Sequence, residues 1–231
     1  MIKAILVDDE RLALEWRTSK VGELLAFLIH HKGEKVSRHL IIDCLWEHFD
    51  VERATAHFHT TIYYLRQSLN SVGIKDLILH DKGFYRIDTN RIDCDYYKFD
   101  NFVSDNPVNS ENIKLYENYI KLYKGGYLEG NSYPWSQQLK ENLENKYMDI
   151  LLRLYHYYLN EQNLPTAAKL LRKALQSNPL AEDIHAKLIR VYLLANDRVS
   201  AMKQYDALSW ILKDEFGIEP GDEVRQLLNI R

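Results

Sequence analysis

Uncharged hydrogen-bonding side chains gather on one face of a helix that the periodicity predicts over residues 52–71. That face carries His57, Thr60, Thr61 and Tyr64. Apolar residues at helical spacing form the other face: Ala54, Phe58, Ile62, Leu65 and Leu69. A threonine can contact base edges or thymine methyl groups, and tyrosine and histidine can hydrogen-bond to bases or phosphates. Because an α-helix fits the major groove of DNA, this pattern favours readout of a nucleic acid duplex over catalysis.

Cationic side chains near the predicted starts of two earlier helices could hold phosphates. They are Arg17, Lys20, Lys35 and Arg38. The exposed N–H groups at a helix N-terminus attract anions as well. Lys82 lies in a predicted turn, from which it could reach the DNA backbone or the minor groove.

Three helices and a hairpin are predicted in the first part of the chain. Thr18 or Ser19 can cap a first helix, which ends where Gly33 can adopt a left-handed conformation. Ser37 can cap a second helix, and the helix over 52–71 is the third. Two short β-prone runs then flank the turn sequence DKG. This order is that of a winged helix-turn-helix.

The second part of the chain is predicted to be helical throughout, so the fold class is mainly α. The predicted helices span 110–124, 135–161, 165–177, 181–195, 198–215 and 221–229. Residues 157–168 resemble residues 191–202 at an offset of 34, the repeat length of tetratricopeptide helix pairs. A tetratricopeptide-like domain is therefore expected, with an ordinary helical bundle as the alternative. We expect three segments: 1–14, a DNA-binding domain over 15–93, and a helical domain over 94–231.

Composition limits the class of protein. The net charge is −3, and residues 15–93 carry 11 Lys+Arg and 11 Asp+Glu, so any DNA-binding surface depends on where the charges lie. Two cysteines cannot form a disulfide scaffold. No apolar run is long enough to span a membrane and no signal peptide is evident, so we expect a cytoplasmic protein without membrane contact.

Other chemistries find little support. His57 and His59 point about 200° apart on a helix, so they are poorly placed to share a metal ion. Cys44 lies on an apolar face and indicates a buried thiol. A set of tyrosines at helical spacing in the second part indicates packing between helices. No phosphate-binding loop or nucleophile motif is present, so we expect no enzyme activity, no cofactor and no metal.

Several motifs occur in the order of a known family. EWRTSK (15–20), HTTIYYLRQSL (59–69) and GFYRID (83–88) resemble the winged-helix effector domain of two-component response regulators, in the branch shared with the Streptomyces antibiotic regulatory proteins. From CDYYKFD (94–100) to EFGIEPGDEVRQL (215–227), the chain resembles that branch's bacterial transcriptional activation domain. The resemblance implies that the recognition helix falls on 52–71. Its DNA-facing positions would be His57, Thr60, Thr61 and Tyr64, extended to Tyr63 and Arg66, although Arg66 could instead bond within the domain.

The first 14 residues resemble the opening of a receiver domain, with Asp8 and Asp9 as the acidic pair. The phosphoryl-accepting Asp, the hydroxyl residue and the Lys that should follow are missing, because residue 14 leads directly into EWRTSK. We therefore expect a remnant of the first receiver strand without phosphorylation or a working metal site. That strand could substitute for the missing small sheet by pairing with the hairpin.

The sequence thus predicts a sequence-specific transcriptional regulator that binds double-stranded DNA. The helical domain would mediate dimerisation or contact RNA polymerase or other transcription proteins. The alternative is a helical-repeat adaptor whose winged helix makes only protein contacts, and a third interpretation is a shortened chain that folds poorly. Binding to DNA through phosphates would weaken steeply with salt, which separates the regulator from the adaptor.

Overall fold

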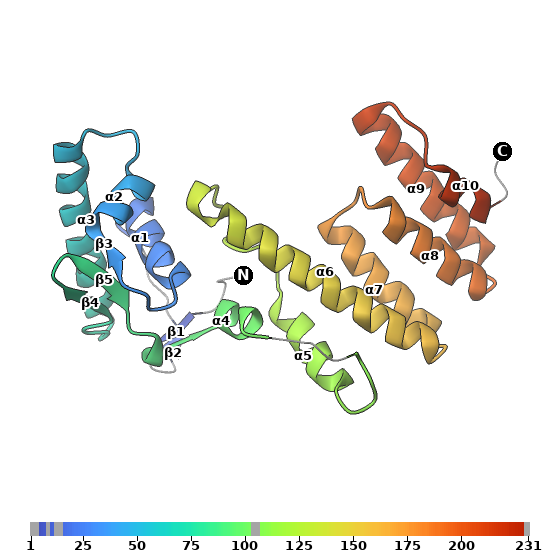
Figure 1. Ribbon diagram of the computed structural model, residues 1–231, viewed down its shortest axis with the longest axis horizontal. Helices are drawn as coiled ribbons and strands as arrows, with labels where there is room; N and C mark the ends of the chain where they lie inside the picture. The colour runs from blue at the N-terminus through green and yellow to red at the C-terminus, as the bar shows by residue number, and fades with distance from the viewer. Residues whose placement is uncertain (1–4, 8–9, 12–15, 103–106, 229–231) are drawn as a thin grey trace. The chain divides into compact units, whose positions relative to one another are not determined.

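The computed structural model describes residues 5–7, 10–11, 16–102 and 107–228 (Figure 1). The chain divides into two compact units. The first consists of Met1–Asn101 and Lys124–Lys140, and the second of Phe102–Tyr123 and Glu141–Arg231. The segment 124–140, which lies within the expected helical domain, is therefore part of the same unit as the winged helix. Asp8 and Asp9 lie outside the described residues.

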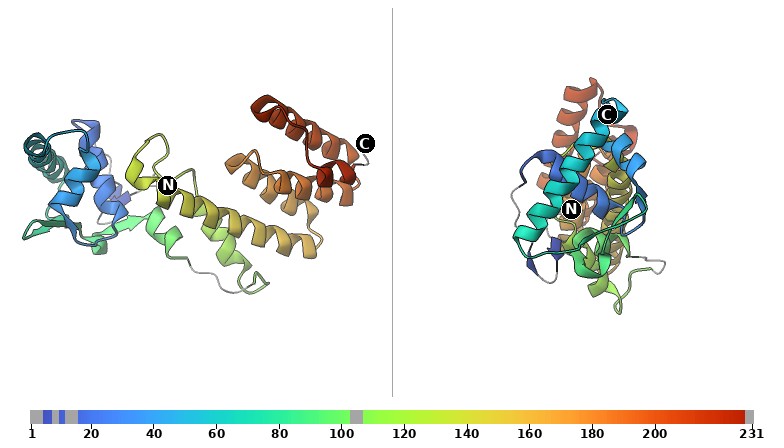
Figure 2. Two further views of the ribbon diagram at one scale, coloured as in Figure 1. Left: turned by 45° about the horizontal axis from the view of Figure 1, so that its top comes forward. Right: turned by 90° about the vertical axis from the view of Figure 1, so that its left-hand side faces the viewer.

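The first unit contains the expected winged helix-turn-helix (Figure 2). Its helices are α1 (Ser19–His30), α2 (Arg38–Leu45), α3 (Val51–Ser71) and α4 (Asp95–Asp100). Its strands are β1 (Ile5–Val7), β2 (Glu10–Arg11), β3 (Val36–Ser37), β4 (Ile78–Asp81), β5 (Phe84–Ile87) and β6 (Ile92–Cys94), and two 3-10 turns cover Thr89–Arg91 and Pro134–Ser136. Strands β3, β5 and β4 form one three-stranded sheet, and β2, β1 and β6 form another.

Local sequence explains where these elements begin and turn. The Ser37 hydroxyl accepts a hydrogen bond from the Leu40 N–H at 3.1 Å, so it caps α2 as expected. An Asp50 carboxylate oxygen caps α3 in the same way. Between β4 and β5, Lys82 and Gly83 both have positive φ, 47° and 84°, as a two-residue type I′ hairpin turn requires. The hairpin β4–β5 is the wing.

The N-terminal strand does not pair with the wing, contrary to our expectation. Strand β1 pairs antiparallel with β6, with Leu6 opposite Asp93, and the wing strands belong to the other sheet. Strand β5 has β3 on one side and β4 on the other, so this strand of the wing offers no edge to β1, whereas β4 lies at the edge of its sheet. Strand β6 offers the edge that β1 occupies.

Helices α1 and α3 bury the apolar core of the winged helix. Leu24, Phe58 and Leu65 are fully buried at 0% exposure. Each such side chain contributes about 1.5–3 kcal/mol by leaving water. The Phe58 ring meets Trp46 from the end of α2 and Tyr85 from the wing, so it joins three elements of the domain.

Two later segments are anchored to the C-terminal end of α1. The Tyr97 hydroxyl donates to the Ile29 carbonyl at 2.9 Å, and the Tyr96 hydroxyl donates to the His30 carbonyl at 3.3 Å. The last carbonyls of a helix lack partners within the helix, so these bonds satisfy them. From the segment 124–140, Tyr127 places its hydroxyl 3.1 Å from His30 Nδ1.

The burial of His30 makes the stability of this unit depend on pH. Burial, with smaller contributions from His31 and Lys32, lowers the pKa of His30 to about 4. The unfolded chain takes up this proton near pH 6.5, so it binds more protons than the folded chain between about pH 6.5 and 4. We therefore expect the free energy of unfolding to fall as the pH drops through that range.

Urea unfolding at about pH 7 and about pH 5 measures this effect. His30→Gln should retain a polar partner for Tyr127 and should flatten the pH dependence relative to the unmodified chain. An equal pH dependence in both proteins would contradict the assignment to His30.

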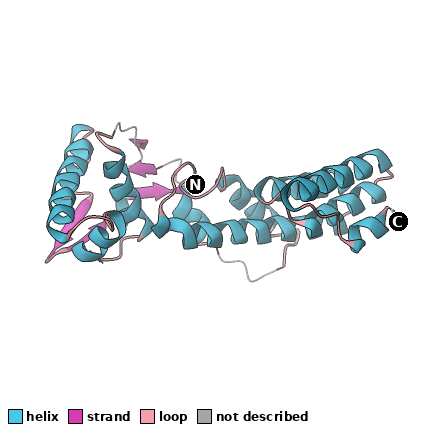
Figure 3. Cartoon of the chain, turned by 90° about the horizontal axis from the view of Figure 1, so that it is seen from above, coloured by secondary structure: helices cyan, strands magenta, loops and turns pink. Residues whose placement is uncertain are grey.

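The second unit is a stack of helices (Figure 3). They are α5 (Ile113–Leu122), α6 (Gln137–Asn160), α7 (Leu164–Ser177), α8 (Glu182–Leu194), α9 (Arg198–Phe216) and α10 (Asp222–Leu227), and α6 belongs to this unit from Glu141 onward. Among the described residues of the whole chain, no helix meets the length and apolarity needed to cross a membrane.

The 34-residue repeat is present at the level of backbone conformation. Gln162 and Asn196 adopt nearly the same left-handed φ, 56° and 57°, in the turns that precede α7 and α9. Asn163 then caps α7, and Asp197 caps α9, each through a side-chain oxygen. The alanines one turn later, Ala167 and Ala201, are both at 0% exposure, as close helix approach requires. The tetratricopeptide-like expectation is thereby confirmed.

Candidate nucleic-acid interface

Helix α3 has one buried face, and Thr61 lies at its edge. Thr61 is only 8% exposed. At 100° per residue, its side chain points about 60° from Phe58 and about 40° from Leu65, both of which are in the core. The expectation that Thr61 shares an exposed polar face with its neighbours is wrong for this reason. His57 and Thr60, in contrast, are exposed.

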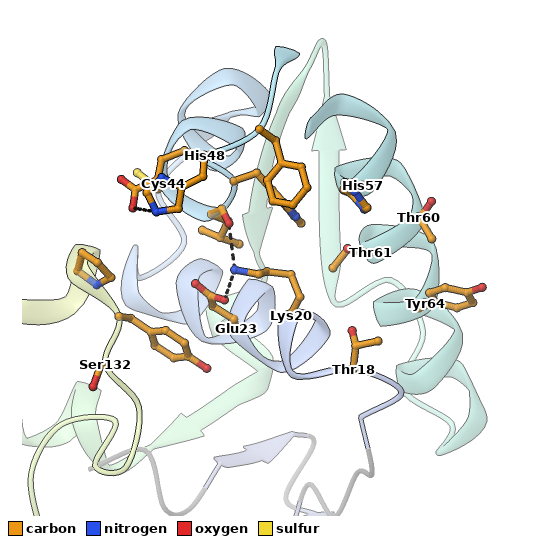
Figure 4. A pocket seen from close by; sticks show the side chains of 16 residues that line it. Thr18, Lys20, Glu23, Cys44, His48, His57, Thr60, Thr61, Tyr64 and Ser132 are labelled. Atoms are coloured by element: carbon orange, nitrogen blue, oxygen red, sulfur yellow. Dashed lines mark hydrogen bonds and ion pairs between the residues drawn. The ribbon is translucent and has the colours of Figure 1, made fainter. Parts of the chain in front are cut away.

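The side of α3 that carries these residues borders an open cavity of about 550 Å³. Its lining includes His57, Thr60, Thr61 and Tyr64 from α3, together with residues from the start of α1, the end of α2 and the loop that follows it. In Figure 4, Thr61 points from α3 toward the cavity, whereas Tyr64 points away from Lys20. The four polar residues are thus neighbours, but they do not all project from one outer surface.

Three residues that face outward from α3 were missed by the pattern of uncharged polar groups. His59, Tyr63 and Gln67 lie one turn apart, and all three are exposed. Tyr63 is 61% exposed and was expected to face DNA only from the family resemblance. These three side chains point away from the core side chains of α3. The angle of 100° per residue gives that direction, so the helical spacing alone could have identified these residues. A glutamine here is suited to bidentate hydrogen bonding with adenine.

The predicted cations differ in their availability. Lys20 Nζ donates to the Leu45 carbonyl at 2.9 Å and lies 2.6 Å from a Glu23 carboxylate oxygen, so it is committed within the domain. Arg17 places its guanidinium 4.1 Å from the centre of the Tyr64 ring. This stacking brings a positive charge to the side of α3 that carries the polar residues.

The remaining cations lie on the wing side of the unit. Lys35 forms a 3.6 Å ion pair with Asp81 in which both side chains are more than half exposed, so the pair is weak and readily exchanged for a phosphate. Arg66 donates to the Ile78 carbonyl at 3.4 Å, which agrees with the alternative of a bond within the domain. Arg38 is half-buried, and its Nε makes no hydrogen bond among the described residues. Lys82 is exposed at the tip of the wing.

The described residues offer no metal centre. Among them, no group of three or more His, Cys, Asp or Glu side chains is placed to hold a metal ion. His57 instead lies with its ring edge-on to Phe49, and His59 lies beside Phe58. The arrangement on α3 consists of hydrogen-bonding groups, aromatic rings and nearby cations, which are the groups that contact bases and phosphates.

Comparison with known families finds two matches along the chain. Residues 105–229 match the family described as the bacterial transcriptional activator domain. Residues 15–84 match the family described as transcriptional regulatory protein, C terminal. The first match covers more than half of the chain.

Relatives that match most of this chain are found among mycobacterial proteins. The chain is 22% identical over 223 residues to the transcriptional regulatory protein MoaR1 of Mycobacterium bovis, which covers 91% of this chain and 71% of MoaR1. MoaR1 of Mycobacterium tuberculosis matches to the same extent.

A solved structure shares the fold. Mycobacterium tuberculosis EmbR, solved in complex with a low-affinity phosphopeptide, matches with a TM-score of 0.66 at 20% identity. The match covers 98% of this chain, which spans 62% of the EmbR chain. With the two domain matches and this fold in the same order, the chain belongs to the family of transcriptional regulators that join a winged helix-turn-helix to a bacterial transcriptional activator domain.

Proposed function

We propose that this chain binds double-stranded DNA in a sequence-specific manner, with α3 in the major groove. The observation that carries the proposal is the outer surface of α3, where Thr60, Tyr63 and Gln67 are exposed above a fully buried core. Arg17 adds a positive charge beside Tyr64 of α3, and Lys82 is exposed at the tip of the wing. Base contacts from the helix and phosphate contacts from these cations would together fix the register on the duplex.

The position of each side chain suggests whether it would contact a base or a phosphate. We assign base or phosphate contacts to His57, Thr60, Tyr63 and Tyr64. We assign phosphate contacts to Arg17, Lys35, Arg38 and Lys82. Lys20, Arg66 and Thr61 would support the surface from within, because each is engaged or buried in the domain.

We further propose that residues 1–14 do not act as a phospho-receiver. The described part of this segment supports this proposal, because β1 pairs antiparallel with β6 and so belongs to the sheet of the DNA-binding unit. The second unit would then contact transcription proteins such as RNA polymerase. In this arrangement, activity would be controlled by binding at the helical unit instead of by phosphorylation of the segment.

Selection of bound sequences from random duplex DNA tests the proposal. We expect an enriched sequence, and we expect Thr60→Ala combined with Tyr64→Ala to weaken binding to it by about 1–3 kcal/mol for each interaction with a base that the substitutions remove. Lys82→Ala should weaken binding to all sequences alike. It should also reduce the slope of log affinity against log salt concentration by the amount expected for about one phosphate contact.

Lys169 is an exposed lysine on α7 of the second unit, so Lys169→Ala is the matched control. It should change neither the affinity for DNA nor the salt dependence of binding. If no sequence is enriched, direct readout by α3 is excluded. If binding barely changes with salt, contacts to phosphates are excluded and the winged helix serves protein contacts.

A further inference from the structure

Helix α9 of the second unit carries apolar side chains that other described elements leave uncovered. Val199 is 66% exposed, Met202 42% and Trp210 67%. Its opposite side, represented by Ala201 and Leu208, is buried in a cluster with residues of α8 and α10. Large apolar side chains this exposed on one helix are candidates for an interaction surface, and Trp210 is the largest of them.

The exposed residues of α9 follow coiled-coil spacing. Val199, Lys203, Asp206 and Trp210 are separated by four, three and four residues, and all four are exposed. At 100° per residue they point within about 60° of one another, so they form one narrow stripe along the helix. We call these four residues the α9 seam. It has an apolar residue at each end and opposite charges in the middle.

The order of residues in the seam is self-complementary in the antiparallel direction. If two copies of α9 pair antiparallel about a two-fold axis between residues 204 and 205, Val199 lies opposite Trp210 of the second copy. Lys203 then lies opposite Asp206 of the second copy. The two-fold axis repeats each contact, so the pairing has two apolar contacts and two ion pairs.

A parallel pairing of the same helices would be unfavourable. In register, it places Lys203 against Lys203 and Asp206 against Asp206, and like charges facing each other across a helix pair are destabilising. The charges are therefore complementary to a second copy of α9 in the antiparallel direction and not in the parallel one. We propose that two copies of this chain associate through the α9 seam in an antiparallel, two-fold arrangement. The proposal uses no residue of α3 and does not depend on DNA binding.

Sedimentation of the full chain over a concentration series, without DNA, tests the association. We expect the mass to rise from the monomer value of 27.3 kDa toward twice that value. Trp210→Ala removes the largest apolar contact of the seam, and it should weaken dimerisation at least tenfold because buried tryptophans dominate interfaces. Lys169→Asp, an exposed charge reversal on α7, is the matched control and should leave the association constant unchanged.

Charge reversal within the seam tests its direction. Lys203→Asp alone should weaken dimerisation, because it places an aspartate against Asp206 of the second copy. Asp206→Lys alone should also weaken dimerisation, because it places a lysine against Lys203 of the second copy. Mixing these two variants should restore a dimer that contains one chain of each, because every facing pair is then of opposite sign.

Several results would overturn the proposal. They are a monomer at all concentrations, a dimer insensitive to Trp210→Ala, or variants that fail to associate when mixed although circular dichroism shows intact helices. Each leaves the DNA-binding proposal unaffected, since Lys203, Asp206 and Trp210 lie in the second unit. Conversely, the seam variants could change dimerisation as expected while the chain selects no DNA sequence. That result would support the dimer proposal and contradict the DNA-binding proposal.

Discussion

Phe58→Ala is expected to lower the free energy of unfolding of the first unit by about 3–5 kcal/mol, the range for removing a buried aromatic side chain. Phe58 is at 0% exposure, and its ring packs edge-on to Trp46 and Tyr85 at centroid distances of 6.3 and 5.1 Å. The cavity left behind would separate α2 from the wing, because this ring contacts both. DNA binding should be lost together with the fold.

Urea unfolding followed by circular dichroism and fluorescence measures this change. Tyr63→Ala is the matched control, since it removes an aromatic ring from the same helix but from a position that is 61% exposed. It should change stability by no more than about 0.5 kcal/mol while weakening DNA binding. A cost below about 1 kcal/mol for Phe58→Ala would show that α3 does not pack as described.

Trp135→Ala is expected to destabilise the first unit by about 2 kcal/mol, less than for a fully buried aromatic side chain because Trp135 is half-buried, although residue 135 lies beyond the match to the DNA-binding family. The Trp135 ring packs edge-on to Phe27 and His30 of α1, each at a centroid distance of 5.1 Å. Its Nε1–H also donates to a carboxylate oxygen of Glu23 at 3.3 Å. The substitution would therefore open a cavity and remove a hydrogen bond from a buried carboxylate.

Trp135→Phe separates these two contributions. It retains the packing on α1 and removes only the bond to Glu23, so it should cost about 1 kcal/mol. The same urea titration measures both variants, with fluorescence corrected for the missing tryptophan. If Trp135→Ala leaves the unfolding of the winged helix unchanged, the segment 124–140 does not belong to that unit in solution.

Local features of the chain were predictable because their causes are local. Ser37 caps α2 as its side chain and position indicate, and the DKG turn forms the two-residue hairpin between β4 and β5. The 34-residue repeat predicted equivalent turns before α7 and α9, since the same residue types meet the same backbone requirement.

Features that depend on contacts distant in sequence were not predictable in this way. Thr61 has a polar side chain, but its direction on α3 places it beside the core. Lys20 has the charge of a phosphate ligand, yet the fold brings the Leu45 carbonyl and Glu23 to it. Helix α4 and the segment 124–140 carry no signal of a docking site, because their partners are carbonyls and rings at the end of α1.

The helices, the wing, the repeat and the family resemblance all follow from the order of residues, because hydrophobic period, capping and turn residues act over a few positions. The three-dimensional packing was needed to establish which polar side chains of α3 remain outside, which cations are already paired, and where Trp135 and β1 attach. These outcomes depend on the direction of each side chain relative to neighbours that are far away in sequence. Burial and pairing change what a charged or polar group can do, and neither can be read from residue type alone.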